Sequence, residues 1–185
     1  DDGGMSFSWG RQFQGSSTGE GESVTTLASQ DGLVYAMGVT HGSFQGLHQG
    51  NKDAFVVCLE GGSTKWGIQV GTSDDDWVEA AAADSSGLYV TGTTTGSLYG
   101  VSAGHEDVFL LKLDLKSGAV LWSLQLGAYS ADNVRSISII SPNVIEISGW
   151  SDHLFQKSEG KTGFQATYDS SSGSFLDGTN VYTFI

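Results

Sequence analysis

Basic side chains are scarce in this sequence of 185 residues: 8 Lys and Arg stand against 21 Asp and Glu, and the formal net charge is −13. Proteins that bind phosphate groups do so with clustered cations, so we expect neither nucleic acid nor anionic lipid as a partner. Long hydrophobic runs are also missing. No stretch of the sequence approaches the roughly 18 apolar residues of a membrane span, so we expect no insertion into a membrane.

Cysteine and proline occur once each, as Cys58 and Pro142. A single cysteine excludes a disulfide within the chain, and we interpret Cys58 as a small buried hydrophobic residue on a strand. The chain begins Asp-Asp-Gly-Gly-Met, with neither an initiator methionine nor a signal sequence, which we interpret as a processed product or a piece of a longer protein. Processing would suit an extracellular, cell-surface or organelle-lumen location.

What the sequence does contain is an internal repeat of 54 to 57 residues. Its clearest mark is a tryptophan followed three positions later by a glutamine, at Trp9, Trp66 and Trp122. Three further residues recur in the same order, and these are Val24, Val78 and Val134; Gly38, Gly92 and Gly149; and Phe55, Phe109 and Phe164. Fixed periods of this length are typical of solenoids and propellers.

Each repeat divides into four predicted strands, which we name A to D in chain order. Short or alternating apolar runs place A at 24–29, 78–83 and 134–140; B at 33–40, 87–94 and 143–150; C at 53–59, 107–113 and 162–168; and D at 6–13, 63–70, 119–126 and 175–184. The segment 74–87, with its acidic start and alanine run, has the local features of a helix. We nevertheless predict a strand there, because the repeat aligns it with the other A strands and helix propensity is worth only about tenths of a kcal/mol per residue.

The repeat resembles the bacterial β-propeller repeat (SBBP type) over nearly the whole chain. The resemblance rests on the order of its motifs, which are Trp, Gln, Asp-Asp-Asp, Tyr-Val-Thr-Gly, Lys-Leu-Asp and a closing Trp. The hairpin that carries Asp114, Gly118 and Trp122 is similar to the docking motif of quinoprotein-type propellers. Both resemblances imply four-stranded blades around an axis.

We therefore expect an all-β fold, a β-propeller sector of three four-stranded antiparallel blades plus one extra N-terminal outer strand at 6–13. The third repeat departs from the pattern, because Glu146, Thr162 and Asp177 replace the tyrosine, aspartate and tryptophan of the other two. The chain is expected to form one domain, 1–185, with repeats at about 14–70, 71–126 and 127–185. Since propellers close with about four to eight blades, other blades would come from a partner chain, a second copy or a longer parent.

The D–A and B–C connections of such blades share one end of the molecule, so we expect a binding site there. The acidic residues of the predicted D–A loops and the histidines of the B–C loops meet at that end. The candidate binding residues are Glu20, Glu22, Asp74, Asp75, Asp76, Asp132, His48, His105 and Tyr99.

Two interpretations of the acidic loops remain open. Carboxylate and carbonyl oxygens suit Ca²⁺, so the loops would form a divalent-cation or sugar site. Alternatively, Glu22, Asp76 and Asp132, each two positions before an A-strand valine, cap the loops by accepting hydrogen bonds from backbone N–H groups. We favour the second interpretation and expect no cofactor, with Ca²⁺ as the one ion that these loops would suit.

The sequence contains no nucleophile elbow, no P-loop, no dinucleotide fingerprint and no paired-histidine metal motif, so we expect no enzymatic activity. Two functions from different classes remain. The first is a binding or scaffold module that recognises a protein or a glycan through the acidic loop face. The second is a purely structural subunit of a larger complex, in which the blades serve to pack against neighbours.

Overall fold

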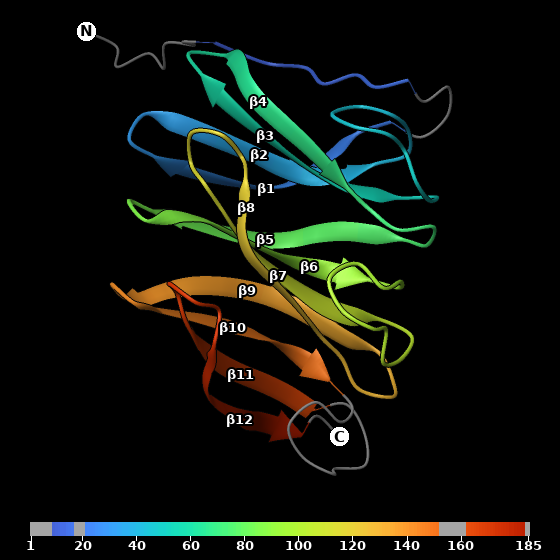
Figure 1. Ribbon diagram of the computed structural model, residues 1–185, viewed down its shortest axis with the longest axis vertical. Helices are drawn as coiled ribbons and strands as arrows, with labels where there is room; N and C mark the ends of the chain where they lie inside the picture. The colour runs from blue at the N-terminus through green and yellow to red at the C-terminus, as the bar shows by residue number, and fades with distance from the viewer. Residues whose placement is uncertain (1–8, 17–20, 152–161, 184–185) are drawn as a thin grey trace, which may run out of the picture.

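The computed structural model describes residues 9–16, 21–151 and 162–183, and all regular structure within them is β-strand (Figure 1). Twelve strands form three four-stranded antiparallel sheets, which we call blades 1, 2 and 3. Blade 1 contains β1 (Ser23–Gln30), β2 (Leu33–Thr40), β3 (Asp53–Glu60) and β4 (Ser63–Val70); blade 2 contains β5 (Asp76–Asp84), β6 (Gly87–Thr94), β7 (Asp107–Leu113) and β8 (Val120–Leu126); blade 3 contains β9 (Asp132–Ser141), β10 (Val144–Ser151), β11 (Thr162–Asp169) and β12 (Phe175–Thr183). The strands of each blade pair in chain order, and their ends lie within two residues of the predicted A to D strands. The all-β prediction is therefore confirmed.

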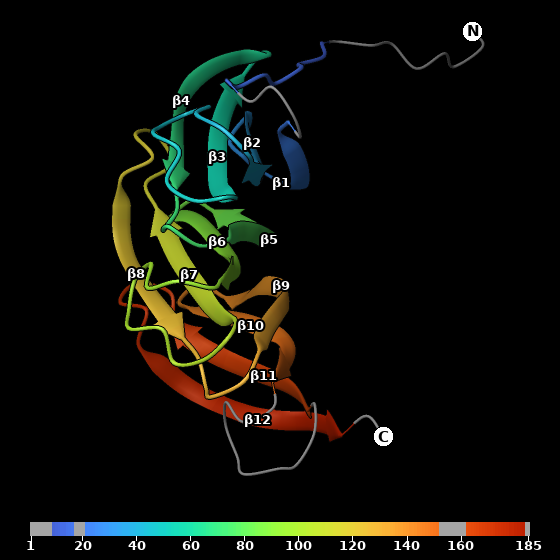
Figure 2. The ribbon, with the colours of Figure 1, turned by 90° about the vertical axis from the view of Figure 1, so that its right-hand side faces the viewer.

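The blades lie side by side in a curved stack, the arrangement of a propeller sector (Figures 1 and 2). Their first strands β1, β5 and β9 are neighbours, and between the first two the Thr25 hydroxyl donates a hydrogen bond to the Val78 carbonyl oxygen at 2.8 Å. The last strands β4, β8 and β12 run along the opposite edge of the stack (Figure 2). Each blade therefore packs one face against the next blade.

Two hydrophobic layers fill the seams between the blades. The first joins blades 1 and 2, with Tyr35, Met37, Val56 and Cys58 on one side and Val90, Phe109, Leu111 and Leu113 on the other. The second joins blades 2 and 3, with Tyr89, Val108 and Leu110 facing Ile137, Ile145, Ile147, Phe164 and Tyr168. Strand β7 is buried at every position, because its alternate side chains enter both seams.

The alanine run forms strand β5, as the repeat predicts and the local helix propensity does not. Ala81 and Ala83 pack against the seam of blades 1 and 2, while Ala80 and Ala82 pack against the seam of blades 2 and 3. Small side chains on both faces let β5 fit between β1 and β9. Packing on two sides outweighs a weak propensity for helix.

A tryptophan on the last strand of one blade lies against a glycine of the next blade. A Cβ atom on Gly118 would stand 2.6 Å from the ring of Trp66, and a Cβ atom on Gly173 would stand 2.9 Å from the ring of Trp122. The Trp66 indole N–H also donates a hydrogen bond to the Leu115 carbonyl oxygen at 3.0 Å. Trp66 and Trp122, which recur at the repeat spacing, therefore pack between blades.

The prediction of an extra outer strand at 6–13 is wrong for residues 9–13, because these residues pair with no strand in the described part of the chain. Residues 6–8 lie outside the described part. A strand needs a neighbour for its backbone N–H and C=O groups, and the described chain offers none beside this segment. Side chains hold it instead. A Cβ atom on Gly62 would lie 3.3 Å from the Trp9 ring, and the Phe13 ring centroid lies 5.6 Å from that of Phe44.

Candidate binding site on the loop face

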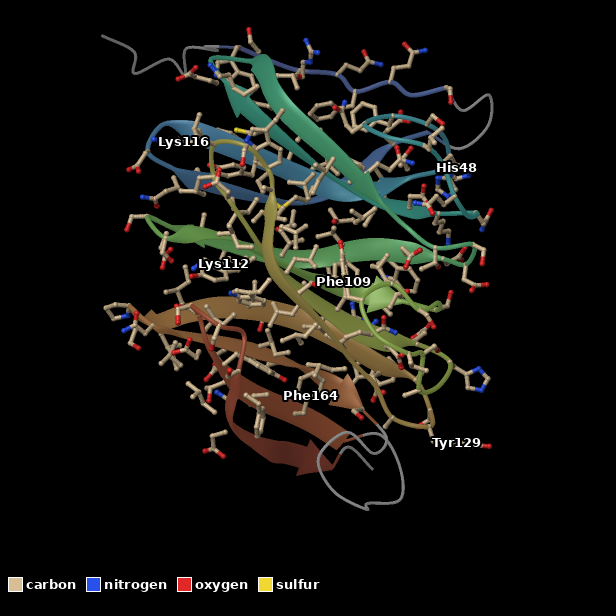
Figure 3. All side chains as sticks on the ribbon, viewed as in Figure 1. His48, Phe109, Lys112, Lys116, Tyr129 and Phe164 are labelled. Carbon is tan, nitrogen blue, oxygen red and sulfur yellow. The ribbon has the colours of Figure 1, made fainter. Side chains whose placement is uncertain are left out.

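The connections predicted to share one end of the molecule do so. We call this end the loop face, and it comprises residues 41–52, 71–75, 95–106 and 127–131. Figure 3 places His48 and Tyr129 at this end and Lys116 at the opposite end. Residues 152–161, the third B–C loop, and Glu20 lie outside the described residues.

A buried aspartate and a glutamine fix the backbone of the first B–C loop. Asp53 is fully buried and accepts hydrogen bonds from Gln69 Nε2 at 2.7 Å and from the Gln49 backbone N–H at 3.0 Å. Gln69 in turn uses its Oε1 atom to accept the backbone N–H groups of Phe44 at 2.9 Å and Gln45 at 3.2 Å. We call this arrangement the Asp–Gln clamp, and it satisfies the loop amides with side chains of the blade itself.

Blade 2 repeats the clamp. Asp107 accepts hydrogen bonds from Gln125 Nε2 at 2.8 Å and from the Ala103 N–H at 2.9 Å, and Gln125 Oε1 accepts the N–H groups of Leu98 and Tyr99. Neither these aspartates nor these glutamines were among the candidate binding residues. The signal was present in the glutamine that recurs three positions after each tryptophan.

Asp76 holds the D–A loop that precedes it. Its buried carboxylate accepts hydrogen bonds from the Thr72 backbone N–H at 2.6 Å and from the Thr72 hydroxyl at 3.0 Å. Burial raises the pKa of this carboxyl group, while the hydrogen bonds from Thr94 and Thr72 oppose the rise. The carboxylate therefore caps the loop from inside, as the second interpretation of the acidic residues predicts.

Asp132 has the same role one repeat later. It is buried, and it accepts hydrogen bonds from the Ala128 backbone N–H at 2.6 Å and from the Ser151 hydroxyl. Glu22 is partly buried and accepts a hydrogen bond from the Thr40 hydroxyl at 3.2 Å. The loop-capping interpretation is thus confirmed for Asp76 and Asp132, whereas Glu22 accepts its hydrogen bond from the side chain of Thr40.

The other candidate residues do not form one cluster. Asp74 and His105 are exposed on separate loops, and His48 Nδ1 lies 3.3 Å from the carboxylate of the first clamp. Tyr99 packs against the seam of blades 1 and 2, where burial and then the charge of Asp76 raise its pKa to about 12. Their use in binding stays a prediction.

Asp75 lies in a hollow of about 500 Å³ between the loops of blades 1 and 2. The hollow is also lined by His41, Lys52, Trp77 and Glu106, none of which was a candidate. Lys52 Nζ lies 3.7 Å from Asp75 Oδ2, so the two charges partly compensate. The hollow therefore offers an aromatic ring, hydrogen-bond acceptors and a cation to one ligand.

Backbone hydrogen bonds between neighbouring loops shape this hollow. The Asp76 N–H donates to the Lys52 carbonyl oxygen at 2.9 Å, and the Thr95 N–H donates to the Asp75 carbonyl oxygen at 2.9 Å. Asn51 Nδ2 donates to Asp75 Oδ1 at 3.0 Å. These hydrogen bonds connect the loops that form the walls of the hollow.

Within residues 9–16, 21–151 and 162–183, no three His, Cys, Asp or Glu side chains come together in a group that could hold a metal ion. The same residues include no helix long and apolar enough to cross a membrane.

The fold defines an all-β protein built of four-stranded propeller-type blades. Among solved structures it is similar to BamB from Moraxella catarrhalis, with 13% sequence identity and a TM-score of 0.49, over 85% of this chain and 38% of that chain. This chain thus spans less than half the length of that protein. No protein-family model matches the sequence, so the resemblance to the bacterial β-propeller repeat stays a prediction, and no curated protein matches it either.

Proposed function

We propose that the protein is a non-catalytic binding or scaffold module of a secreted, cell-surface or luminal assembly, and that it recognises a protein or glycan partner through the loop face. The observation that carries this proposal is the hollow of about 500 Å³ formed by loops of two blades. Its volume falls in the range of about 300–1,000 Å³ that is usual for sites of small ligands or ligand side chains.

The chemistry of the lining supports a polar ligand with an apolar face. The Trp77 indole N–H donates a hydrogen bond to Glu79 Oε1 at 2.8 Å, which orients the ring beside the hollow. Asp75 and Glu106 supply acceptors for hydroxyl or amide groups, and Lys52 supplies a donor. Aromatic rings combined with a few fixed polar groups suit sugar rings and peptide side chains.

A second function, that of a purely structural subunit, is favoured by a different observation. Leu27 and Val24 on β1 are 63% and 42% exposed, whereas their counterparts in the other repeats, Ile137 and Val78, are 8% and 1% exposed. Exposed apolar side chains at positions that are packed in the other repeats are typical of a surface that is covered in an assembly.

Arrays of glycans and peptides, probed with the purified chain, distinguish the two functions. The binding function predicts a defined set of hits that Trp77→Ala weakens at least about tenfold, equivalent to about 1.4 kcal/mol. Asp75→Asn should weaken the same hits, because it removes a charge from the hollow while keeping its size.

Lys116→Ala is the matched control, since Lys116 is exposed at the opposite end of the molecule (Figure 3). It should leave every hit unchanged. An absence of hits, together with persistent co-purification of other proteins, would reject the binding function in favour of the structural one.

A further inference from the structure

A pocket of about 420 Å³ opens between blades 1 and 2 at the end of the molecule opposite the loop face, and we call it the seam pocket. Its inner part is formed by the buried Cys58 and the partly buried Leu33, Trp66 and Leu115. Its rim carries Gln30 and the exposed charged residues Asp31, Glu60, Lys65 and Lys116. None of these residues belongs to the loop face, so the seam pocket is separate from the site proposed there.

The next seam shows what fills the matching space between blades 2 and 3. Lys112 holds the position that Cys58 holds in blade 1, since each pairs with the tryptophan of its own blade. Lys112 is 6% exposed, and its Cε atom lies 2.6 Å from where a Cβ atom on Gly87 would stand. Its Nζ atom donates to the Ser170 carbonyl oxygen at 2.9 Å and lies 5.2 Å from the centroid of the Tyr89 ring. An unbranched alkyl chain with an ammonium group therefore fits between two blades at this point.

The first seam has no such chain, because the side chain of cysteine is much shorter than that of lysine. Leu115, the counterpart of Ser170, uses its carbonyl oxygen to accept the Tyr35 hydroxyl at 3.2 Å and the Trp66 indole N–H at 3.0 Å. Both lone pairs of this oxygen are thus occupied. Burial raises the pKa of the Cys58 thiol, which therefore stays uncharged at neutral pH. The inner part of the seam pocket consequently suits an alkyl chain better than a polar group.

The charges at the rim favour a cationic head group over an anionic one. Glu60 and Lys65 form an ion pair with 2.8 Å between Oε2 and Nζ, so their charges cancel. Asp31 on the rim, and Asp114 at the start of the hairpin that supplies the residues of blade 2, then stand against Lys116. The net charge of the whole chain is −13. A carboxylate head group would be repelled by this excess of negative charge, whereas an ammonium group would be attracted.

We propose that the seam pocket binds a small primary alkylamine, with its unbranched alkyl tail against Cys58 and Trp66 and its ammonium group at the rim beside Asp31. A lysine side chain of a partner protein would enter with its ammonium group first. It would bring a charge to the apolar inner part, so the ligand is a free amine. The proposal does not rest on the function proposed for the loop face.

Titration with n-hexylamine, followed by the indole N–H resonances of the full chain, tests the proposal. At neutral pH the probe is an ammonium ion, like the side chain of lysine. The Trp66 resonance should shift with a Kd of roughly 1 mM, as expected for a ligand of this size. Trp122, whose indole N–H has the matching position in the filled seam, is the internal control and should not shift. Trp66→Phe and Trp122→Phe assign the two resonances.

The absence of a Trp66 shift at roughly 10 mM amine, ten times the expected Kd, would overturn the proposal. Equal shifts at Trp66 and Trp122 would also overturn it, because they would show that the amine acts on the whole protein rather than in the seam pocket.

Hexanol and hexanoate share the alkyl chain of the probe and test its head group. Hexylamine should bind at least about threefold more tightly than hexanol, and hexanoate should bind most weakly. Asp31→Asn should weaken the binding of hexylamine to the level of hexanol and leave hexanol unchanged. Asparagine suits the positive φ of 51° at this exposed turn position, so the variant should fold. Equal affinities for all three head groups would overturn the assignment of an amine.

Cys58 gives an independent measurement, because it is the only cysteine in the chain. Methyl methanethiosulfonate transfers its methylthio group to the Cys58 thiolate and releases methanesulfinate. Hexylamine at about twice its Kd should slow this reaction about threefold by mass action in the folded chain, and not at all in urea. An unchanged rate in the folded chain would overturn the proposal.

Cys58→Lys should fill the seam pocket as Lys112 fills the next seam, and should abolish the Trp66 shift. A folded Cys58→Lys variant that still binds hexylamine would overturn the proposal. If this variant does not fold, Asp31→Asn and the labelling of Cys58 still decide the outcome.

Discussion

Gly118 and the indole ring of Trp66 are in direct contact across the seam between blades 1 and 2, so close that a Cβ atom on Gly118 would stand 2.6 Å from the ring. Gly118 also has a positive φ of 71°, a conformation that side-chain-bearing residues rarely adopt. Two independent requirements, one for conformation and one for space, therefore select glycine at this turn.

Gly118→Ala should lower the free energy of unfolding by about 2 to 4 kcal/mol, the sum of left-handed strain and overpacking. Gly32→Ala is the control, since Gly32 has a φ of 80° but nothing within 4 Å of the added methyl group. It should cost only about 1 kcal/mol from strain. Chemical denaturation of both variants measures the difference. If both variants lost the same free energy of unfolding, the contact of Gly118 with Trp66 would add nothing to the cost of the substitution.

Trp122→Ala should lower the free energy of unfolding by about 3 kcal/mol, which is in the range for truncation of large packed aromatic residues. The ring packs against Tyr89 with centroids 6.3 Å apart, and its indole N–H donates to the Ser170 carbonyl oxygen at 3.2 Å. Trp122→Phe keeps an aromatic ring and should cost about 1 to 2 kcal/mol through the lost hydrogen bond and volume. Equilibrium unfolding that shows a loss below about 1 kcal/mol for Trp122→Ala would contradict the role of this ring in the seam.

Asp169 should contribute to the loss of stability in acid. Hydrogen bonds from the Ser171 hydroxyl, then from the Ser172 hydroxyl and N–H, lower the pKa of its carboxyl group to about 2. Because the pKa is lower in the folded than in the unfolded state, the contribution is present above about pH 4 and is lost as the pH falls toward about 2. Unfolding midpoints of the wild type and of Asp169→Asn should converge over this interval, and a constant difference would contradict the assignment.

Millimolar calcium should leave the melting temperature of the protein unchanged. The carboxylates of Asp76 and Asp132 accept backbone N–H groups of their own loops, which leaves Asp74 as an exposed acid without a cluster around it. Thermal unfolding with calcium, with magnesium and with a chelator tests this expectation. A calcium-specific rise of several degrees that Asp74→Asn removes would revive the cation-site interpretation through binding to the folded state.

The repeat made most of the fold predictable, because aligned segments must share one conformation even where local preference differs. Strand β5 is the clearest case, since its alanine run favours a helix in isolation and its repeat position requires a strand. The strand at 6–13 was predicted by the same argument and failed over 9–13. A D-strand sequence forms a ladder only when another strand lies beside it, and sequence similarity does not show whether that neighbour is present.

The candidate site was less predictable, because a loop sequence shows which side chains are polar but not which way they point. The carboxylates of Asp76 and Asp132 turn inward and accept backbone N–H groups, whereas Asp75, which directly precedes Asp76, lines the hollow. His41, Lys52, Trp77 and Glu106 come from three different segments, the loop 41–52, strand β5 and the loop 95–106, and meet only in the folded chain. The spacing of these residues along the sequence does not show that their side chains line the same hollow.

The Asp–Gln clamps have a consequence for how the loop face can change. Asp53 and Gln69 hold the first B–C loop through main-chain N–H groups, which are the same for every residue except proline. An exposed loop side chain such as Leu47 can therefore be exchanged without disturbing the path of the backbone. The blades thus hold the loop backbone in one conformation while its exposed side chains are substituted. The binding specificity of the loops can therefore be changed one substitution at a time, by natural variation or in a library.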